Sequence, residues 1–122
     1  MSVVFALATP PSKSAICVFR VSGNGCNKYL RKMFVEKEFL PNKFYTRLLK
    51  KGNKIIDKVG LVVFKGPKSY TGEDSFEIYA HGSLAVMSSI IDLFKALGLE
   101  EAVAGEFTKR AFKANVLRRL IG

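Results

Sequence analysis

Short apolar segments of strand length recur along the chain, and turn-forming residues separate them. Segments of this kind indicate β-strands, and apolar residues spaced three or four apart indicate helices. We predict strands over residues 3–8, 15–21, 44–49, 55–64, 75–80 and 99–103. We predict helices over residues 26–33 and 83–97, and a third helix that begins near Phe107. The pattern predicts a single α+β domain with a mixed or antiparallel sheet and helices packed on it.

The helix predicted over residues 83–97 connects the last two predicted strands. We expect the strand at 99–103 to return beside the strand at 75–80, which makes a right-handed strand–helix–strand crossover. The spacing of this helix predicts the following core-facing residues: Leu84, Met87, Ile91 and Phe94. Residues 66–74 form a polar segment that is too long for a hairpin turn, and loops of this kind often carry function.

The positive charge of the chain is concentrated in its first half. Twenty Lys and Arg oppose ten Asp and Glu, and the formal net charge is +10. Residues 1–60 hold twelve of the basic and three of the acidic residues. This concentration suits an anionic partner such as nucleic acid, because each phosphate contact releases condensed counterions. The alternative is that the lysines in residues 50–58 are solvated and keep an edge strand soluble, since no aromatic residues alternate with them as base stacking requires.

Several functional classes are excluded by what the sequence lacks. The longest uncharged stretch near the middle, residues 80–91, is too short to span a membrane. No GxxxxGK[ST] sequence exists, so this chain alone should not hydrolyse a nucleoside triphosphate. One histidine, His81, and two cysteines without metal-type spacing support neither a zinc site nor a Cys–His nucleophile. We expect no metal, no catalytic residue, a structural role for His81, and reduced thiols at Cys17 and Cys26 in the cytoplasm.

Two charged residues within apolar strand segments are the candidates for a binding site. Arg20 ends an apolar run and Glu77 stands between two apolar residues, and half-buried charges need partners. Either the two pair with each other, or each reaches water at a strand end, or a ligand supplies the complement. A carboxylate accepts two parallel hydrogen bonds from the edge of a pterin or guanine ring, and an arginine fork matches a ligand carboxylate or carbonyl. Glu106 and Arg110, four apart, fit either an ordinary helix ion pair or the wall of the same pocket.

Three sets of motifs, taken in order, resemble one protein family. They are Ala8–Pro11 with Phe19–Gly23, then Pro67–Asp74 with Glu77 and His81–Gly82, then Gly105–Phe112. Together they resemble the N-terminal domain of the MnmE/TrmE family of tRNA modification GTPases over nearly the whole chain. The resemblance implies that residues 1–115 form this domain, that residues 116–122 are an atypical tail where a helical domain would begin, and that the GTPase domain is absent.

The resemblance also implies a ligand and partners. A domain of this family binds a reduced folate, 5-formyl-tetrahydrofolate, and forms a homodimer whose fold is similar to one half of the folate-binding domain of aminomethyltransferase. It works with a flavoprotein partner on carbon 5 of the wobble uridine of tRNA, and tRNA is a further candidate partner. The family's folate-contacting arginine and glutamate fall on Arg20 and Glu77, and Phe19 or Phe107 would border the ring.

Two departures from the family pattern bear on these expectations. A lysine that contacts folate in the family falls near Val116, and residues 114–116 do not reproduce it. Ser83 replaces the second glycine that usually follows His81–Gly82. One alternative is therefore a dimerisation or RNA-docking domain that binds no folate, and another is a stand-alone basic RNA-binding domain.

Overall fold

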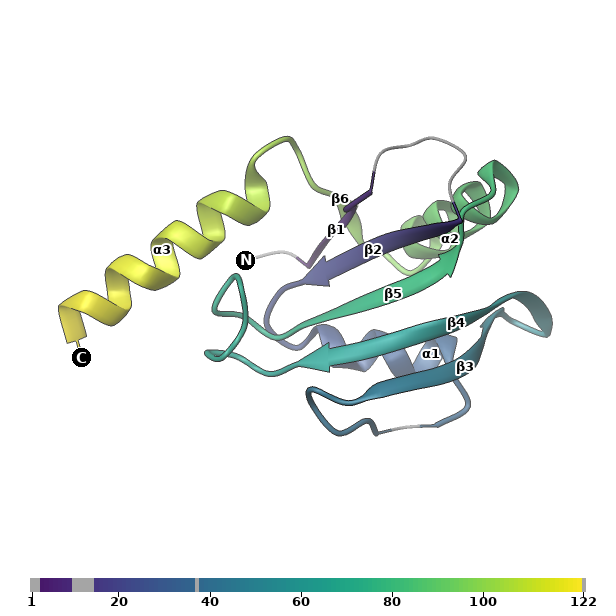
Figure 1. The fold of residues 1–122 in the computed structure, drawn as a ribbon, viewed down its shortest axis with the longest axis horizontal. Helices are drawn as coiled ribbons and strands as arrows, with labels where there is room; N and C mark the ends of the chain where they lie inside the picture. Colours follow the sequence, from purple (N-terminus) through teal and green to yellow (C-terminus); the bar gives the residue numbers. More distant parts are fainter. Residues whose placement is uncertain (1–2, 10–14, 37, 122) are drawn as a thin grey trace.

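A mixed sheet of six strands forms the centre of the computed structural model, which describes residues 3–9, 15–36 and 38–121 (Figure 1). The strands lie in the order β3-β4-β5-β2-β1-β6. Their bounds are β1 Val4–Leu7, β2 Ile16–Ser22, β3 Phe44–Lys51, β4 Lys54–Phe64, β5 Ser75–His81 and β6 Glu100–Glu101. The helices are the 3₁₀ turn η1 Cys26–Tyr29, then α1 Leu30–Met33, α2 Leu84–Ala96 and α3 Glu106–Ile121. The predicted α+β class is confirmed.

The last strand lies at a different edge of the sheet from the one predicted. β6 pairs in parallel with β1, where Glu100 lies opposite Val4, and all other neighbouring strands are antiparallel. The prediction that residues 99–103 return beside β5 is therefore wrong. Both edges of β5 are already hydrogen-bonded, to β2 and to β4, so the returning segment reaches the open edge of β1 instead. α2 still connects two parallel strands, but β2 and β1 lie between them.

One face of the sheet and the shorter helices form the hydrophobic core. Alternate residues of β2 and β5 contribute their apolar side chains to it, because successive side chains in a strand point to opposite faces. Residues of η1, α1 and α2 belong to the same buried cluster, and these helices lie behind the sheet in Figure 1. The buried strand residues are Cys17, Phe19, Val21, Phe76, Ile78 and Ala80.

The core face of α2 differs in part from its prediction. Met87 and Phe94 are buried as expected, whereas Leu84 is 63% exposed and Ile91 is only partly buried. The buried stripe is centred near Ile90, so residues 84 and 91 lie on its flank. The helix begins at a capping residue: the hydroxyl of Ser83 accepts a hydrogen bond from the backbone N–H of Val86 at 3.1 Å.

The opposite face of the sheet carries a row of residues that the cross-strand register places side by side. Arg20 on β2 lies opposite Glu77 on β5, Glu77 lies opposite Val62 on β4, and Val62 lies opposite Phe44 on β3. The ring of Phe44 lies over Gly60, where a Cβ atom would come within 2.3 Å of it. α3 projects from the edge of this sheet (Figure 1). No helix among the described residues is long and apolar enough to cross a membrane.

Candidate functional site

Arg20 and Glu77 form an ion pair with each other across β2 and β5. Nε of Arg20 donates to Oε2 of Glu77 at 2.9 Å, and Nη2 lies 2.8 Å from the same oxygen. The side chain of Glu77 is 13% exposed and that of Arg20 is 33% exposed. Of the alternatives drawn from the sequence, mutual pairing is the one the structure confirms. The protein itself supplies the complement to both charges, so their burial does not by itself require a ligand.

Tyr79 also contacts the Glu77 carboxylate, and the sequence alone did not identify it as a residue of this site. Its hydroxyl donates to Oε1 of Glu77 at 2.6 Å, from the same face of β5 two residues further along. Burial of the phenol, and next its hydrogen bond to Glu77, raise the pKa of Tyr79 to about 12. The i, i+2 spacing along a strand, which places both side chains on one face, is the sequence signal that could have identified this contact. The Glu77 carboxylate is therefore held in place by both of its oxygens.

We predict that Tyr79 titrates later than an ordinary tyrosine. Its pKa is raised in the folded state from 10.0 to about 12, so the neutral phenol is favoured there. The resulting stability is fully present below pH 10 and is lost as the pH rises from there through about 12. An ultraviolet titration of the phenolate should show a late step in the wild type and none in Tyr79→Phe. A wild-type curve without that step would contradict the burial of this hydroxyl.

Two aromatic rings lie close to the Arg20 guanidinium. Its Cζ lies 5.7 Å from the ring centroid of Tyr70, in the loop before β5, and 5.8 Å from that of Phe107 in α3. Phe107 therefore lies beside the Arg20–Glu77 pair, and Tyr70 is an addition from the structure. A pocket of about 100 Å³ opens beside the pair and also contacts Phe64. It shares Tyr70 and Phe64 with a more open hollow of about 800 Å³.

Phe19 does not belong to this site. Its side chain is fully buried, and its ring packs edge to face on Phe94 of α2 with centroids 5.7 Å apart. Phe19 and Arg20 are consecutive in β2, so their side chains point to opposite faces of the sheet. The prediction that Phe19 borders a bound ring is therefore corrected: this residue belongs to the core.

Arg110 forms the centre of a second, largely buried network. Its side chain is 4% exposed, and it contacts Oε2 of Glu106 at 2.8 Å and Oε1 of Glu73 at 2.9 Å. It also donates to the backbone carbonyl of Ser22 at 3.3 Å. The hydroxyl of Ser22 lies 2.7 Å from that of Thr71. Of the two alternatives for Glu106 and Arg110, the helix ion pair is present, and the network joins α3 and the loop at 66–74 to the end of β2.

Close packing supports the same junction. Gly72 has a positive φ of 75°, and a Cβ atom there would come within 2.5 Å of the Ala114 Cβ in α3. Hydrogen bonding to Arg110 lowers the pKa of the Glu106 carboxyl. Arg110 and Glu106 lie at the base of α3 and are not among the residues that line the pocket beside Arg20.

His81 contacts Asp57, and the thiols of Cys17 and Cys26 are buried. Nδ1 of His81 lies 2.8 Å from Oδ1 of Asp57, whose other carboxylate oxygen accepts the backbone N–H of His81 at 2.8 Å. Cys17 and Cys26 are buried and unbridged, and burial raises the pKa of the Cys26 thiol to about 12. A thiol with so high a pKa is a weak nucleophile. Among the residues the structure describes, no three His, Cys, Asp or Glu side chains gather as a metal site would require.

Comparison with known proteins assigns the family. The profile of the family described as "GTP-binding protein TrmE N-terminus" matches residues 3–115. The chain belongs to this TrmE N-terminal family. It is 40% identical over 113 residues to the tRNA modification GTPase MnmE of Thermotoga petrophila, covering 92% of the chain and 25% of that protein. The MnmE of Fervidobacterium nodosum is 41% identical over 115 residues, covering 89% and 25%, and that of Helicobacter pylori is 37% identical over 109 residues, covering 89% and 24%. The TrmE-type chain therefore spans about a quarter of the length of these relatives.

Proposed function

We propose that this chain is the folate-binding and dimerising domain of a tRNA modification GTPase, with residues 1–115 forming the domain. The ligand is 5-formyl-tetrahydrofolate or a related reduced folate, which carries a one-carbon unit when bound. In this proposal the domain acts in the cytoplasm with a flavoprotein partner, and the reaction modifies carbon 5 of the wobble uridine in tRNA. Membership of the TrmE N-terminal family supports it, and the likeness to half of the aminomethyltransferase domain stays a prediction.

The observation that carries the folate proposal is the arrangement around Glu77. Each oxygen of a carboxylate accepts more than one hydrogen bond, so Glu77 retains acceptor capacity beside Arg20 and Tyr79. A pterin edge presents two parallel N–H donors to such a group. The rings of Tyr70 and Phe107 both lie within about 6 Å of the Arg20 guanidinium, which in this proposal donates to a ligand carbonyl or carboxylate. The chain's own residues bind and orient the ligand, and none of them is proposed to react.

A reduced folate is too large for the pocket beside the Arg20–Glu77 pair alone, but it fits that pocket and the adjoining hollow together. The pocket at Arg20 and Glu77, about 100 Å³, admits the edge of a bicyclic ring. The hollow of about 800 Å³ that shares Phe64 and Tyr70 with it holds the remainder, and small-molecule sites usually measure about 300–1,000 Å³. We propose that the ring edge enters at Glu77 and that the tail extends over the loop at 66–74.

We propose a homodimer because the sheet face that carries Glu77 also exposes large apolar side chains. Phe44 is 61% exposed and Leu48 is 44% exposed, and the register places both on the same face as Glu77. Large apolar side chains exposed together are typical of protein interfaces. A second copy of this chain is the occupant that the family resemblance implies. Light scattering with and without folate tests this, and a monomer at every concentration would contradict it.

The folate proposal is tested by titrating 5-formyl-tetrahydrofolate calorimetrically against the wild type and Glu77→Gln. The substitution keeps the side chain's shape but removes the charge and the paired acceptors, so we expect affinity to fall about tenfold or more. Glu100→Gln, an exposed carboxylate on β6, is the matched control and should bind as the wild type does. Equal affinities for all three proteins would refute the assignment of Glu77.

One sequence observation favours the alternative of a dimerisation or RNA-docking domain without folate. Val116 stands where the family resemblance places a folate-contacting lysine, and its side chain lies outside the described part of the structure. A chain that is dimeric in solution and binds no reduced folate would support this alternative over the folate-binding one.

A further inference from the structure

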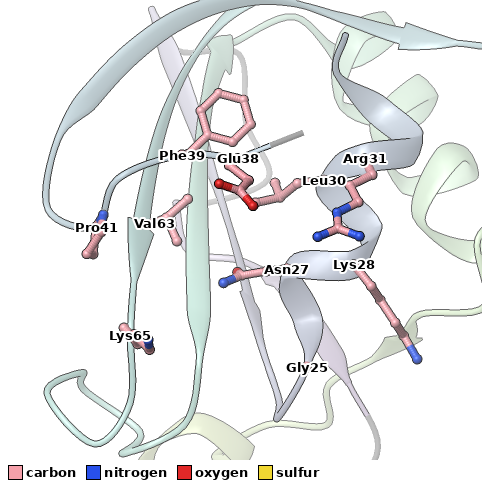
Figure 2. A pocket seen from close by; sticks show the side chains of 10 residues that line it. All are labelled: Gly25, Asn27, Lys28, Leu30, Arg31, Glu38, Phe39, Pro41, Val63 and Lys65. Atoms are coloured by element: carbon pink, nitrogen blue, oxygen red, sulfur yellow. The ribbon is translucent and has the colours of Figure 1, made fainter. Parts of the chain in front are cut away.

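A groove of about 440 Å³ lies between the η1–α1 segment and the end of β4, away from the Arg20–Glu77 pair. Figure 2 shows Arg31 on the helical side and Lys65 on the opposite side, while the Lys28 side chain extends from the helical side away from Asn27. Asn27 lies between these walls, and Glu38 and Phe39 close one end. The groove is larger than a single phosphate needs, and it is open enough to admit a chain of linked groups.

The positive charge in this groove exceeds its negative charge. Lys28, Arg31 and Lys65 are all exposed, against a single carboxylate, that of Glu38. Across the described ranges, the ion pairs of the structure involve other cations, and none includes these three. A concave surface lined by one sign of charge concentrates the electric field and attracts the opposite charge.

The wall of the groove is held by aromatic packing. The ring of Phe39 contacts those of Phe34 and Tyr45 edge to face, with centroids 5.8 Å and 4.9 Å away. The backbone N–H of Leu40 donates to the hydroxyl of Tyr45 at 2.9 Å. On the other wall, Nζ of Lys28 lies 5.2 Å from the ring centroid of Tyr29. The segment at 38–41 is therefore positioned before any partner binds.

We propose that this groove binds the phosphate backbone of RNA. Arg31 and Lys65 contact phosphates in the groove, Lys28 contacts a phosphate at its outer rim, and the side-chain amide of Asn27 donates to a phosphate or sugar oxygen. The excess of cations in residues 1–60 extends the attraction beyond the groove. A concave wall suits a strand that enters it better than a flat vesicle surface. The contacts read charge and shape, so binding is independent of base sequence and does not require folate.

A matched pair of triple variants tests the proposal. Lys28→Gln/Arg31→Gln/Lys65→Gln removes three charges from the groove, and Lys50→Gln/Lys51→Gln/Lys54→Gln removes three from the β3–β4 turn. Binding to a labelled, unmodified tRNA transcript is followed by fluorescence anisotropy over a range of salt concentrations. We expect the groove variant to lose about tenfold or more in affinity and its slope of log K against log salt to flatten by about 2. The turn variant should change affinity by less than about threefold.

Further measurements distinguish phosphate binding in the groove from a damaged fold, a net-charge effect and a different anionic partner. Glu38→Gln removes the groove's carboxylate and is expected to raise RNA affinity, a gain that a damaged fold does not produce. Equal losses in the two triple variants would show a net-charge effect and overturn the site.

Groove-dependent binding of polyglutamate or of anionic vesicles as tight as that of RNA would overturn the choice of partner. Folate titration of the groove variant should match the wild type, so failure here is distinct from failure of the folate proposal.

Discussion

Phe19→Ala is expected to lower the free energy of unfolding by about 3–5 kcal/mol, the usual cost of truncating a buried phenylalanine. The Phe19 side chain is fully buried and packs edge to face on Phe94, so its loss leaves a cavity between β2 and α2. Urea unfolding with linear extrapolation measures the change. The outcome decides between a core residue and a pocket residue, because a pocket residue affects ligand affinity more than stability.

Phe112→Ala is the matched control for this measurement. Phe112 is 69% exposed, so its truncation should change stability by less than about 0.5 kcal/mol. If Phe19→Ala unfolds at the wild-type urea concentration but binds folate weakly, Phe19 belongs to the ligand site after all. We expect the reverse, with a large loss of stability in Phe19→Ala alone.

Arg110→Met is expected to destabilise the protein by about 3 kcal/mol. The substitution keeps much of the side chain's volume but leaves the Glu73 carboxylate, 13% exposed, without its cation. Removing one partner of a buried ion pair costs about 3–5 kcal/mol, because the remaining charge stays desolvated. The loss should also release α3 from the sheet, which hydrogen exchange of the α3 amides reports.

Two variants test the cause of that loss. Lys113→Met replaces an exposed cation on the same helix and should leave stability close to the wild type. Arg110→Met/Glu73→Gln should recover part of the stability, because the uncompensated charge is then removed as well. A double variant less stable than Arg110→Met would show that packing, not charge, is the main contribution of Arg110.

Much of the local structure was predictable because it depends on neighbours along the chain. Glu77 was identified between two apolar residues, which are buried in β5, and the class of the fold followed from the strand and helix patterns. The position of β6 was not predictable in this way. It depended on which sheet edge remained open, and edges are defined only after distant strands have paired.

In the candidate site, too, the residue types were predictable from the sequence, whereas their contacts were not. Arg20 and Glu77 were identified as charges that need partners, but their mutual pairing depends on the register between β2 and β5. The contact of Arg110 with Glu73 spans 37 residues, and no spacing rule connects them. Phe19 was predicted to border the ligand, although the alternation of side chains along β2 places it on the face opposite to Arg20.

By itself, the sequence determined the strand and helix segments, the excess of positive charge and the family motifs. These depend on residue type and on short periodicities, which the backbone geometry of a single segment enforces. Only the tertiary structure decided which charges neutralise each other, which cations line a common groove, and which rings surround Arg20. The physical reason is that ion pairs and ring contacts act over a few ångströms in space, and the packing of the sheet sets those distances between residues far apart in the chain.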